Sequence, residues 1–491
     1  MAVEAYVGRG LPALHLTGLP GAAVQDARER VRPAVESSGL EWPLRRVTVN
    51  FSPADLRKEG PGFDLPIAAV VLAATGQVPL ERLMRFALAG ELSLRGELVA
   101  TPGILAVAAA AARAGLGVIV PAANAAEARL VDGLEVVGAS SLGQVVEFLR
   151  GRWQPDLGES EPATPQRAGP DLADVRGQTH ARRALEVAAA GDHNLLMIGP
   201  PGAGKTMLAR RLPSILPAPT REEALEVTLL HSVAGLLAQG AGLVTRRPFR
   251  APHHTITPAG LLGGGTPLRP GEVSLAHHGV LFLDEVNEFR RDALEGLRQP
   301  LEDGRLLIAR AARSVEFPCR FTLVAAANPC PCGFAGEAGR RCRCKPHLMQ
   351  AYRHRLSGPL LDRIDIRIRV PRLTRSELMG SKHGESSARV RERVDAARDL
   401  QRARLRRSRA RSNGQMTGAQ ARRHAELTSD AERQLGRAVE RFRLTGRGFD
   451  RLLRVSRTIA DLGGSARIET EHLLEALSFR GEEPQAEVGV A

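Results

Sequence analysis

The sequence has no long apolar run. No stretch of about 18 consecutive apolar residues, the length of a membrane-spanning helix, occurs in the chain. The first residues, MAVEAYVGRGLPALHL, also lack a basic region followed by an apolar one, which is the pattern of a secretory signal. We therefore expect neither a membrane span nor a signal peptide, and we expect a cytoplasmic protein.

Cysteine is scarce and unevenly distributed. The chain has five cysteines, and four of them, Cys330, Cys332, Cys342 and Cys344, lie in the segment NPCPCGFAGEAGRRCRC. Such crowding does not make the disulfide framework of a secreted protein. Four thiolates in two Cys-x-Cys pairs suit tetrahedral Zn²⁺, although this spacing is tighter than the usual Cys-x-x-Cys. A structural zinc, packed free thiols and a redox switch all stay open.

Acidic residues are fewer than basic ones. The chain has 54 Asp and Glu against 68 Lys and Arg, a formal net charge of +14, which favours a polyanionic partner such as nucleic acid. The charge is concentrated between Arg389 and Arg423, and no acid occurs between Gln401 and Ala425. A solvated helix face with i,i+4 ion pairs explains the first half of this segment. The acid-free second half favours contact with nucleic-acid phosphates.

Changes in composition divide the chain into domains. Residues 1–150 alternate apolar runs with helical patterns, which predicts a mixed α/β domain. Residues 151–170 are rich in Pro, Gly and acids and predict a linker. Residues 171–372 alternate short strands with helices, as in a parallel sheet sandwiched by helices. Residues 373–480 are charged and helical, and 481–491 form a tail.

A phosphate-binding loop is the most specific motif in the chain. An apolar stretch from Asn194 to Ile198 runs into GPPGAGKT and then into the helical pattern MLARRL. Glycines let backbone N–H groups wrap phosphates, and the start of the following helix adds positive potential. Lys205 is expected to reach the β- and γ-phosphates of ATP, and Thr206 to bind Mg²⁺. The predicted ATP-binding residues of the loop are Gly199, Pro200, Pro201, Gly202, Ala203, Gly204, Lys205 and Thr206.

Polar residues follow two further apolar runs. Asp284 and Glu285 come after the run VLFL, at the carboxyl end of a strand, where ligands gather in parallel sheets. Asp284 suits Mg²⁺, and Glu285 is placed to polarise the attacking water. Asn328 ends the run FTLVAAANP, where it suits a water or a γ-phosphate oxygen, unless it only forms a turn before Pro329. Together these residues predict Mg²⁺-dependent ATP hydrolysis.

Several longer strings resemble one known family. GLPGAAVQDARERVR, FRAPHHT, GVLFLDE, ANPCPCG, SGPLLDRIDI and RTIADL are similar to the magnesium-chelatase-like AAA+ ATPases of the YifB and ComM type, over nearly the whole chain. The resemblance implies an AAA+ core with a helical lid and a homo-hexamer with ATP at subunit interfaces. It also implies sensor 1 at Asn328, an arginine finger for the neighbouring subunit at Arg363, and sensor 2, an ATP-binding arginine on the helical lid, at Arg447. Taken alone, either arginine is better explained as a helix cap or a solvated side chain; its place after a complete nucleotide-binding core favours the functional role.

The resemblance to ComM implies a motor that translocates on DNA and migrates branched intermediates in recombination or natural transformation. The segment EDGRLLIARAARSVEFP resembles a hairpin that lines the pore of helicase relatives, so Arg305, Arg310 and Arg313 are candidates for contact with DNA phosphates. An ATP-dependent protein remodeller stays open as an alternative. Magnesium insertion into a porphyrin also stays open, although the chain contains no integrin-like domain with an Asp-x-Ser-x-Ser loop.

The first 150 residues resemble the S5-like fold shared with the Lon protease domain, most visibly in GELSLRGELVATPGILAVAAAAARAGLGVIVPAANA. Lon uses a Ser-Lys dyad for acyl transfer. In the matching stretches, Gly62 stands at the serine position and Leu105 at the lysine position. We therefore expect no peptidase activity.

Two pairs of adjacent histidines invite a metal interpretation. They are His253, His254, His277 and His278. Packing and hydrogen bonding are the favoured roles for all four.

Overall fold

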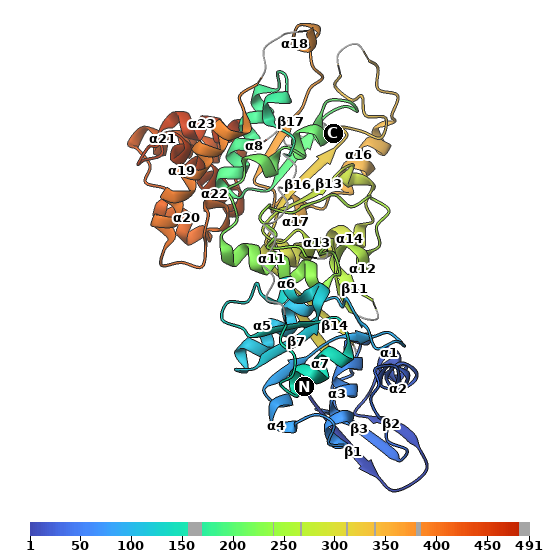
Figure 1. Cartoon of the computed structure of the whole chain (residues 1–491). Helices are drawn as coiled ribbons and strands as arrows, with labels where there is room; N and C mark the ends of the chain where they lie inside the picture. Colours follow the sequence, from blue (N-terminus) through green and yellow to red (C-terminus); the bar gives the residue numbers. More distant parts are fainter. Residues whose placement is uncertain are drawn as a thin grey trace. The chain divides into compact units, whose positions relative to one another are not determined.

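The chain folds into two compact units (Figure 1). The computed structural model describes residues 1–155, 169–238, 240–265, 268–310, 313–337, 340–379 and 384–480. The first unit contains the amino-terminal region together with Arg221–Val244, and the second contains the phosphate-binding loop and everything from Pro270 onward. Within the described residues, no helix has the length and apolar character needed to cross a membrane.

A five-stranded sheet forms the centre of the second unit. The strand order is β10-β13-β16-β9-β17, and every neighbouring pair is parallel. The strands are β9 (Leu195–Ile198), β10 (Phe249–Arg250), β13 (Val280–Leu283), β16 (Thr322–Ala327) and β17 (Ile366–Arg369). β13 and β16 are buried along their whole length, as parallel strands covered on both faces are. The predicted parallel α/β sheet of an AAA+ P-loop core is confirmed.

Successive side chains of the central strands enter two different hydrophobic cores. Met197 of β9 packs in a core that includes α8 (Thr179–Gly191), whereas Leu196 packs in a core that includes α14 (Arg291–Gly296). This alternation follows from the two-residue period of a strand. Since all five strands are parallel, the loops that follow them emerge at one edge of the sheet.

Helices form the carboxyl-terminal part of the second unit, which we call the lid (Figure 1, orange to red). They are α19 (Ser387–Leu405), α20 (Gly418–His424), α21 (Ser429–Phe442), α22 (Gly446–Leu462) and α23 (Thr470–Ser478). α19 and α22 both pack on α8. N-cap residues mark where three of these helices begin. Thr417, Thr428 and Thr445 precede α20, α21 and α22, and each side chain accepts a hydrogen bond from an N–H group in the first turn.

The first unit has two small three-stranded sheets. β1 (Ala2–Gly8), β3 (Arg46–Ser52) and β2 (Ala13–Thr17) form one, with β1 antiparallel and β2 parallel to β3. β4 (Phe86–Leu88), β7 (Gly117–Pro121) and β8 (Val136–Ala139) form the other, which is parallel. The principal helices are α2 (Ala27–Ser37), α3 (Asp64–Ala74), α5 (Ile104–Arg113) and α7 (Leu142–Leu149). Arg30 of α2 forms a paired hydrogen bond with the buried carboxylate of Asp64 on α3.

One helix from the middle of the chain belongs to the first unit. α11 (Arg221–Val233) packs against α5, although its sequence position lies within residues 171–372. Ser232 of α11 donates a hydrogen bond to the buried carboxylate of Glu127, which also accepts from the N–H of Leu105. The position expected for a Lon lysine is therefore a buried leucine in a packed helix.

A buried polar network ties the lid to the sheet. His193, which follows α8, contacts Asp365 through Nδ1 at 2.9 Å and Thr458 of α22 through Nε2 at 2.8 Å. Burial by itself would raise the pKa of Asp365, but the charge of Arg454 and the hydrogen bond from His193 hold that pKa below its usual range. The lid is thus joined to the start of β17 by charged and hydrogen-bonded groups.

The same network continues to Asp461, whose side chain is 0% exposed. This carboxylate pairs with Arg404 of α19 and with Arg457, and it accepts a hydrogen bond from Asn413 at 2.8 Å. Three segments of the lid therefore meet at one buried acid. Removing one partner of such a buried pair leaves an uncompensated charge.

Replacement of Asp461 by Ala should destabilise the second unit by about 3 to 5 kcal/mol, because two arginines lose a buried partner. Urea unfolding followed by circular dichroism measures this. Asp399 is the matched control, since it pairs with Arg402 on the surface at 2.8 Å, and Asp399→Ala should cost at most about 1 kcal/mol. Equal losses in the two variants would contradict the role of the network.

Candidate functional site

Backbone constraints shape the phosphate-binding loop. A Cβ atom on Gly199 would lie 2.1 Å from the carbonyl oxygen of Val370, so the end of β17 leaves no room for a side chain there. Gly204 has a φ of 89°, in the left-handed region that favours glycine, and α9 (Lys205–Ala209) begins directly after it. The Gly199 N–H group donates to the carbonyl of Ala327 at the end of β16. The loop is therefore held by both strands that flank β9.

Four predicted site residues meet at the carboxyl edge of the sheet. The Lys205 amine donates hydrogen bonds to the Gly199 carbonyl at 2.6 Å and to Asn328 Oδ1 at 3.1 Å. The Thr206 hydroxyl donates to Asp284 Oδ2 at 2.6 Å. These side chains come from the tips of three adjacent strands, β9, β13 and β16. A hydroxyl and a carboxylate in contact, beside a loop of N–H groups, suit a Mg²⁺–nucleotide complex.

Electrostatics and strain mark the same site. Burial lowers the pKa of Lys205, and the negative charges of Asp284 and Glu285 oppose this effect. Glu285 has a φ of 49° and a ψ of 47°, a left-handed conformation that is uncommon for a residue with a side chain. Its backbone N–H donates to Asp284 Oδ1 at 3.0 Å. This turn separates the carboxylate of Glu285 from the Thr206–Asp284 contact.

One of the four histidines noted in the sequence, His254, lies beside Glu285, a position that the sequence did not predict. Nδ1 of His254 is 4.0 Å from Glu285 Oε2, and its ring packs edge-on against Phe289 with centroids 6.5 Å apart. His253 instead contacts its neighbour Thr255 at 2.9 Å. The motif FRAPHHT begins with the two residues of β10, which is the neighbour of β13 in the sheet. Only the strand order brings His254 to Glu285, so the sequence alone gave no signal for it.

The four crowded cysteines lie together after β16. Their sulfurs all lie within 4.8 Å of one another, and all four are free thiols. Sγ of Cys330 is 3.4 Å from that of Cys332 and 3.7 Å from that of Cys342. Hydrogen bonds from the backbone N–H groups of Phe334 and Arg343, above all, lower the pKa of the Cys332 thiol to about 6. The structure thus brings together cysteines that are far apart in the loop sequence.

Arg363 and Arg447 lie away from this chain's own phosphate-binding loop. The carbonyl of Arg363 accepts a hydrogen bond from Asn194 at the amino end of β9. β9 has four residues, which span about 13 Å at the rise of a strand. The Arg363 guanidinium pairs with Glu302. Arg447, at the start of α22, is 3.8 Å from Asp362. Both arginines therefore belong to the opposite edge of the sheet.

The hairpin that precedes Asn328 has the expected form. β14 (Arg305–Arg310) and β15 (Arg313–Pro318) pair antiparallel. Arg305 forms an exposed ion pair with Glu316 at 2.9 Å. Arg310 and Arg313 face each other in the register at the end of the hairpin, and their side chains lie outside the described part of the structure.

Comparisons with known proteins identify the family. The family described as "Magnesium chelatase, subunit ChlI" matches residues 171–378, "Subunit ChlI of Mg-chelatase" matches 3–124, and the carboxyl-terminal family of the same subunit matches 384–480. The chain is 42% identical over 488 residues to the competence protein ComM of Haemophilus influenzae. The aligned region covers 98% of this chain and 94% of ComM. The chain belongs to the magnesium-chelatase-like AAA+ family of ComM and YifB.

Two further relatives extend the same match. YifB of Escherichia coli, an uncharacterised protein, is 42% identical over 482 residues, with 98% of this chain and 94% of YifB covered. An uncharacterised protein of Mycobacterium tuberculosis is 47% identical over 480 residues, with 97% and 95% covered. The resemblance inferred from the sequence motifs is confirmed over nearly the full length of this magnesium-chelatase-like protein.

Replacement of His254 by Ala should lower ATP turnover about tenfold, as expected when a reacting group is slightly misplaced, and should leave nucleotide affinity nearly unchanged. The reason is that His254 contacts Glu285 and not Lys205 or Thr206. Steady-state phosphate release and binding of fluorescent ADP provide the two measurements. His253→Ala is the control. An equal loss in both variants, or an equal loss of affinity, would exclude a positioning role for His254.

Proposed function

We propose that this protein is an ATP-hydrolysing, hexameric AAA+ motor that acts on DNA as a helicase or branch-migration factor in recombination or natural transformation. The observation that carries the ATPase part is the convergence of Lys205, Thr206, Asp284 and Asn328 at one sheet edge. The printed name of the Haemophilus influenzae relative, a competence protein, supports the DNA part. The location we propose is the cytoplasm, where ATP, DNA and reduced thiols occur together.

Each residue of the site has a chemical task in this proposal. The phosphate-loop N–H groups and Lys205 hold the β- and γ-phosphates, and Thr206 with Asp284 holds Mg²⁺, which neutralises phosphate charge when bound. Glu285 orients and polarises the attacking water, and Asn328 holds that water or a γ-phosphate oxygen. Lys205 donates a hydrogen bond to Asn328 Oδ1 at 3.1 Å, so the two side chains would reach the same γ-phosphate when nucleotide binds.

Arg363 and Arg447 serve the nucleotide of a neighbouring subunit in the proposed ring. Their position at the edge of the sheet opposite the phosphate-binding loop supports this assignment, because neither lies beside its own chain's Lys205. A guanidinium supplied by a neighbour stabilises the charge that develops on the transferred phosphoryl group. Hydrolysis then requires assembly, and an isolated subunit is a poor ATPase.

Mixing two inactive variants tests the shared site. Lys205→Ala lacks the lysine of its own site, and Arg363→Ala lacks the arginine supplied to the neighbour's site. Each variant alone should therefore lose ATPase activity by about 10³-fold or more. In an equal mixture about one quarter of the interfaces combine an intact Lys205 with an intact Arg363, and ATPase activity should return to that extent.

The control mixture pairs Lys205→Ala with Glu285→Gln. Both changes damage the same cis site, so no interface becomes complete and no activity should return. Activity in this control, or none in the first mixture, would contradict a finger supplied across the interface. Size-exclusion chromatography with light scattering reports the assembly of each variant.

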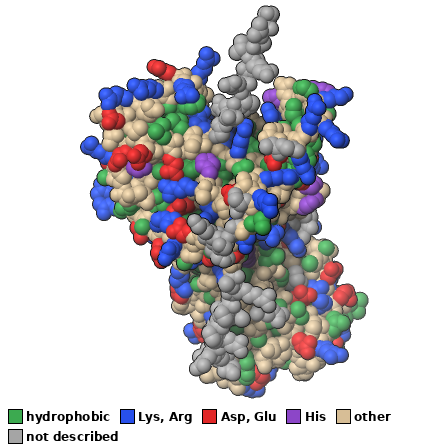
Figure 2. Space-filling view, turned by 90° about the horizontal axis from the view of Figure 1, so that it is seen from above, with side chains coloured by type: hydrophobic (Ala, Val, Ile, Leu, Met, Phe, Trp, Pro, Cys, Tyr) green, Lys and Arg blue, Asp and Glu red, His purple; other side chains and the backbone are tan. Residues whose placement is uncertain are grey.

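Charge alone does not identify a DNA surface. Figure 2 shows Lys and Arg side chains spread over the visible face with Asp and Glu among them. The segment after α19 is different: Arg406, Arg407 and Arg409 are exposed, and they form no ion pair with any residue that the structure describes. Arginines without acidic partners are available for phosphate contact. This supports the proposed contact between the acid-free lid segment and DNA, alongside Arg305, Arg310 and Arg313 of the hairpin.

A DNA-stimulated ATPase assay tests the motor. Rates are measured without DNA, with single strands and with a mobile four-way junction, together with migration of that junction. The wild type should be stimulated, Glu285→Gln should bind nucleotide but lose about 10²-fold or more in rate, and the triple change of Arg406, Arg407 and Arg409 to Ala should lose the stimulation but keep the basal rate.

A triple change of Arg433, Arg437 and Arg441 to Ala on α21 removes the same charge elsewhere on the lid and serves as the control. No effect of DNA on wild-type hydrolysis, with stimulation by an unfolded protein instead, would favour the protein remodeller. No stimulation by either, with activity only beside porphyrin-pathway partners, would favour a magnesium-chelatase subunit.

Two further assignments complete the proposal. The four clustered cysteines bind a structural Zn²⁺, in addition to ATP and Mg²⁺ at the loop. The amino-terminal unit is a non-peptidase module, because neither Gly62 nor Leu105 offers the nucleophile or base of a Ser-Lys dyad.

A further inference from the structure

We propose that Zn²⁺ held by Cys330, Cys332, Cys342 and Cys344 is a clip that braces the nucleotide site, so that zinc occupancy and nucleotide binding strengthen each other. This inference rests on the proposed ATP site and extends it.

The sulfur positions fit one tetrahedral ion. Four sulfurs bound at about 2.3 Å around a tetrahedral Zn²⁺ are about 3.8 Å from one another. The separations between Cys330, Cys332 and Cys342 are 3.4, 3.7 and 3.6 Å, far longer than the roughly 2.05 Å of a disulfide. Four thiolates also commonly bind an iron–sulfur cluster. Such a cluster places several metal ions between the sulfurs and requires longer sulfur–sulfur distances than these.

Backbone N–H groups complete the cage. The N–H of Ala335 donates to Sγ of Cys330 at 3.3 Å, that of Cys332 to Cys344 at 3.4 Å, and that of Cys344 to Cys342 at 3.5 Å. Hydrogen bonds to sulfur stabilise thiolates and fix the direction in which they point. The two Cys-x-Cys pairs are therefore joined by the backbone as well as by the sulfurs.

The first side of the cage packs on the phosphate-binding loop. Gly333 has a φ of 82°, and a Cβ atom there would lie 2.5 Å from Cδ of Pro201, so the backbone of the cysteine turn lies directly against the ring of Pro201. Arg372 strengthens this contact: it donates to the Pro201 carbonyl at 3.3 Å, pairs with Glu337 at 3.4 Å, and lies over the ring of Phe334 at 5.6 Å. The turn also begins two residues after Asn328.

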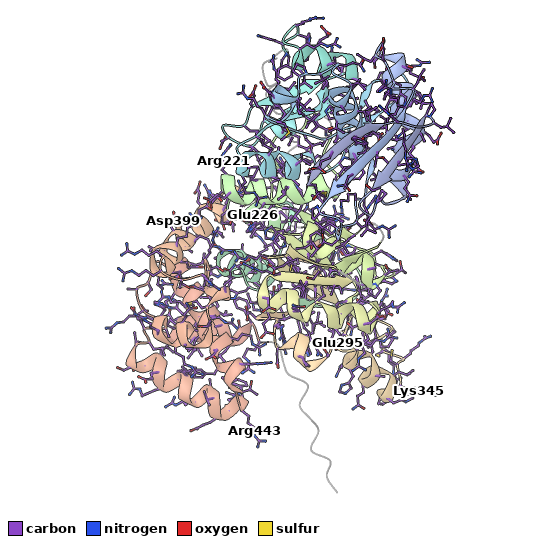
Figure 3. The ribbon with its side chains drawn as sticks, turned by 90° about the horizontal axis from the view of Figure 1, so that it is seen from below. Arg221, Glu226, Glu295, Lys345, Asp399 and Arg443 are labelled. Carbon is purple, nitrogen blue, oxygen red and sulfur yellow. The ribbon has the colours of Figure 1, made fainter. Side chains whose placement is uncertain are left out.

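The second side reaches the turn that carries Glu285. Lys345, labelled in Figure 3, follows the last cysteine and leads into α16 (Pro346–His354). Asn287 donates a hydrogen bond to the carbonyl of Tyr352 on this helix at 2.8 Å, and Arg355 donates to the carbonyl of Asn287 at 3.0 Å. A single ion bound by both Cys-x-Cys pairs thus joins the segment that packs on Pro201 to the segment that is hydrogen-bonded to Asn287.

Binding at two coupled sites has a reciprocal consequence. If zinc holds the turn that packs on Pro201, nucleotide must raise the affinity for zinc by the same factor by which zinc raises the affinity for nucleotide, since coupling free energy is shared. A purely local structural zinc would show neither effect. This reciprocity separates the clip from an ordinary zinc knuckle.

The test measures metal content and nucleotide affinity on untagged full-length protein without DNA. Elemental analysis should find one zinc and negligible iron per chain. The double change Cys342→Ser and Cys344→Ser removes two ligands but leaves Gly333 and Phe334 in place. It should lower zinc below about one tenth per chain and weaken fluorescent ADP binding about tenfold, within the usual range of coupling. Cys319→Ala, at the buried fifth cysteine, should change neither value.

A second measurement covers the case in which the double variant does not fold. Wild-type protein is stripped of metal with a chelator and a reducing agent, and fluorescent ADP binding is measured before and after zinc is restored. Zinc affinity is measured by equilibrium competition with a colorimetric chelator, with and without ADP, and ADP should raise that affinity by the same factor.

Four outcomes overturn the proposal: less than about one tenth of a zinc in the wild type, iron in its place, zinc loss without any change in ADP affinity, or a zinc affinity that ADP does not raise. Failure of the motor proposal is separate, because it would appear as bound zinc and tight ADP with no response to DNA.

Discussion

The parallel pairing of β9 between β16 and β17 is the constraint on which the rest of the second unit depends. It places the ends of three strands side by side, so the phosphate-binding loop, Asn328 and the segment after Val370 meet within hydrogen-bond distance. Gly199 is required because the Val370 carbonyl would otherwise clash with its side chain. The same pairing sends Arg363 to the amino edge, where Asn194 holds its carbonyl.

In the proposed function, the two edges of the sheet have two tasks. The carboxyl edge collects the groups that would bind the nucleotide and Mg²⁺, and the amino edge carries Arg363 and Arg447, which would serve a neighbouring subunit. A parallel sheet separates these sets by the length of its strands. In the proposed ring, that separation is what allows each interface to combine one edge from each subunit. The buried network around Asp461 and His193 keeps the lid, and with it Arg447, in register with the sheet.

The cysteine segment belongs to the nucleotide site rather than to a separate finger. Its turn contacts Pro201, and its exit helix contacts Asn287. Neither contact can be read from the spacing of the cysteines. The spacing indicated four ligands, and it left zinc, free thiols and a redox switch open; the sulfur separations are what favour a single tetrahedral ion.

The sequence by itself determined the family, the parallel α/β fold and the residues at the tips of β9, β13 and β16, because these depend on local patterns: an apolar strand, the residues that follow it, and glycines where the backbone turns. His254 beside Glu285, Arg363 and Arg447 at the far edge, α11 in the first unit, and the cysteine turn on Pro201 were decided only by the tertiary structure. Each of these depends on the order of strands in the sheet or on contacts between distant segments, and no local pattern encodes either.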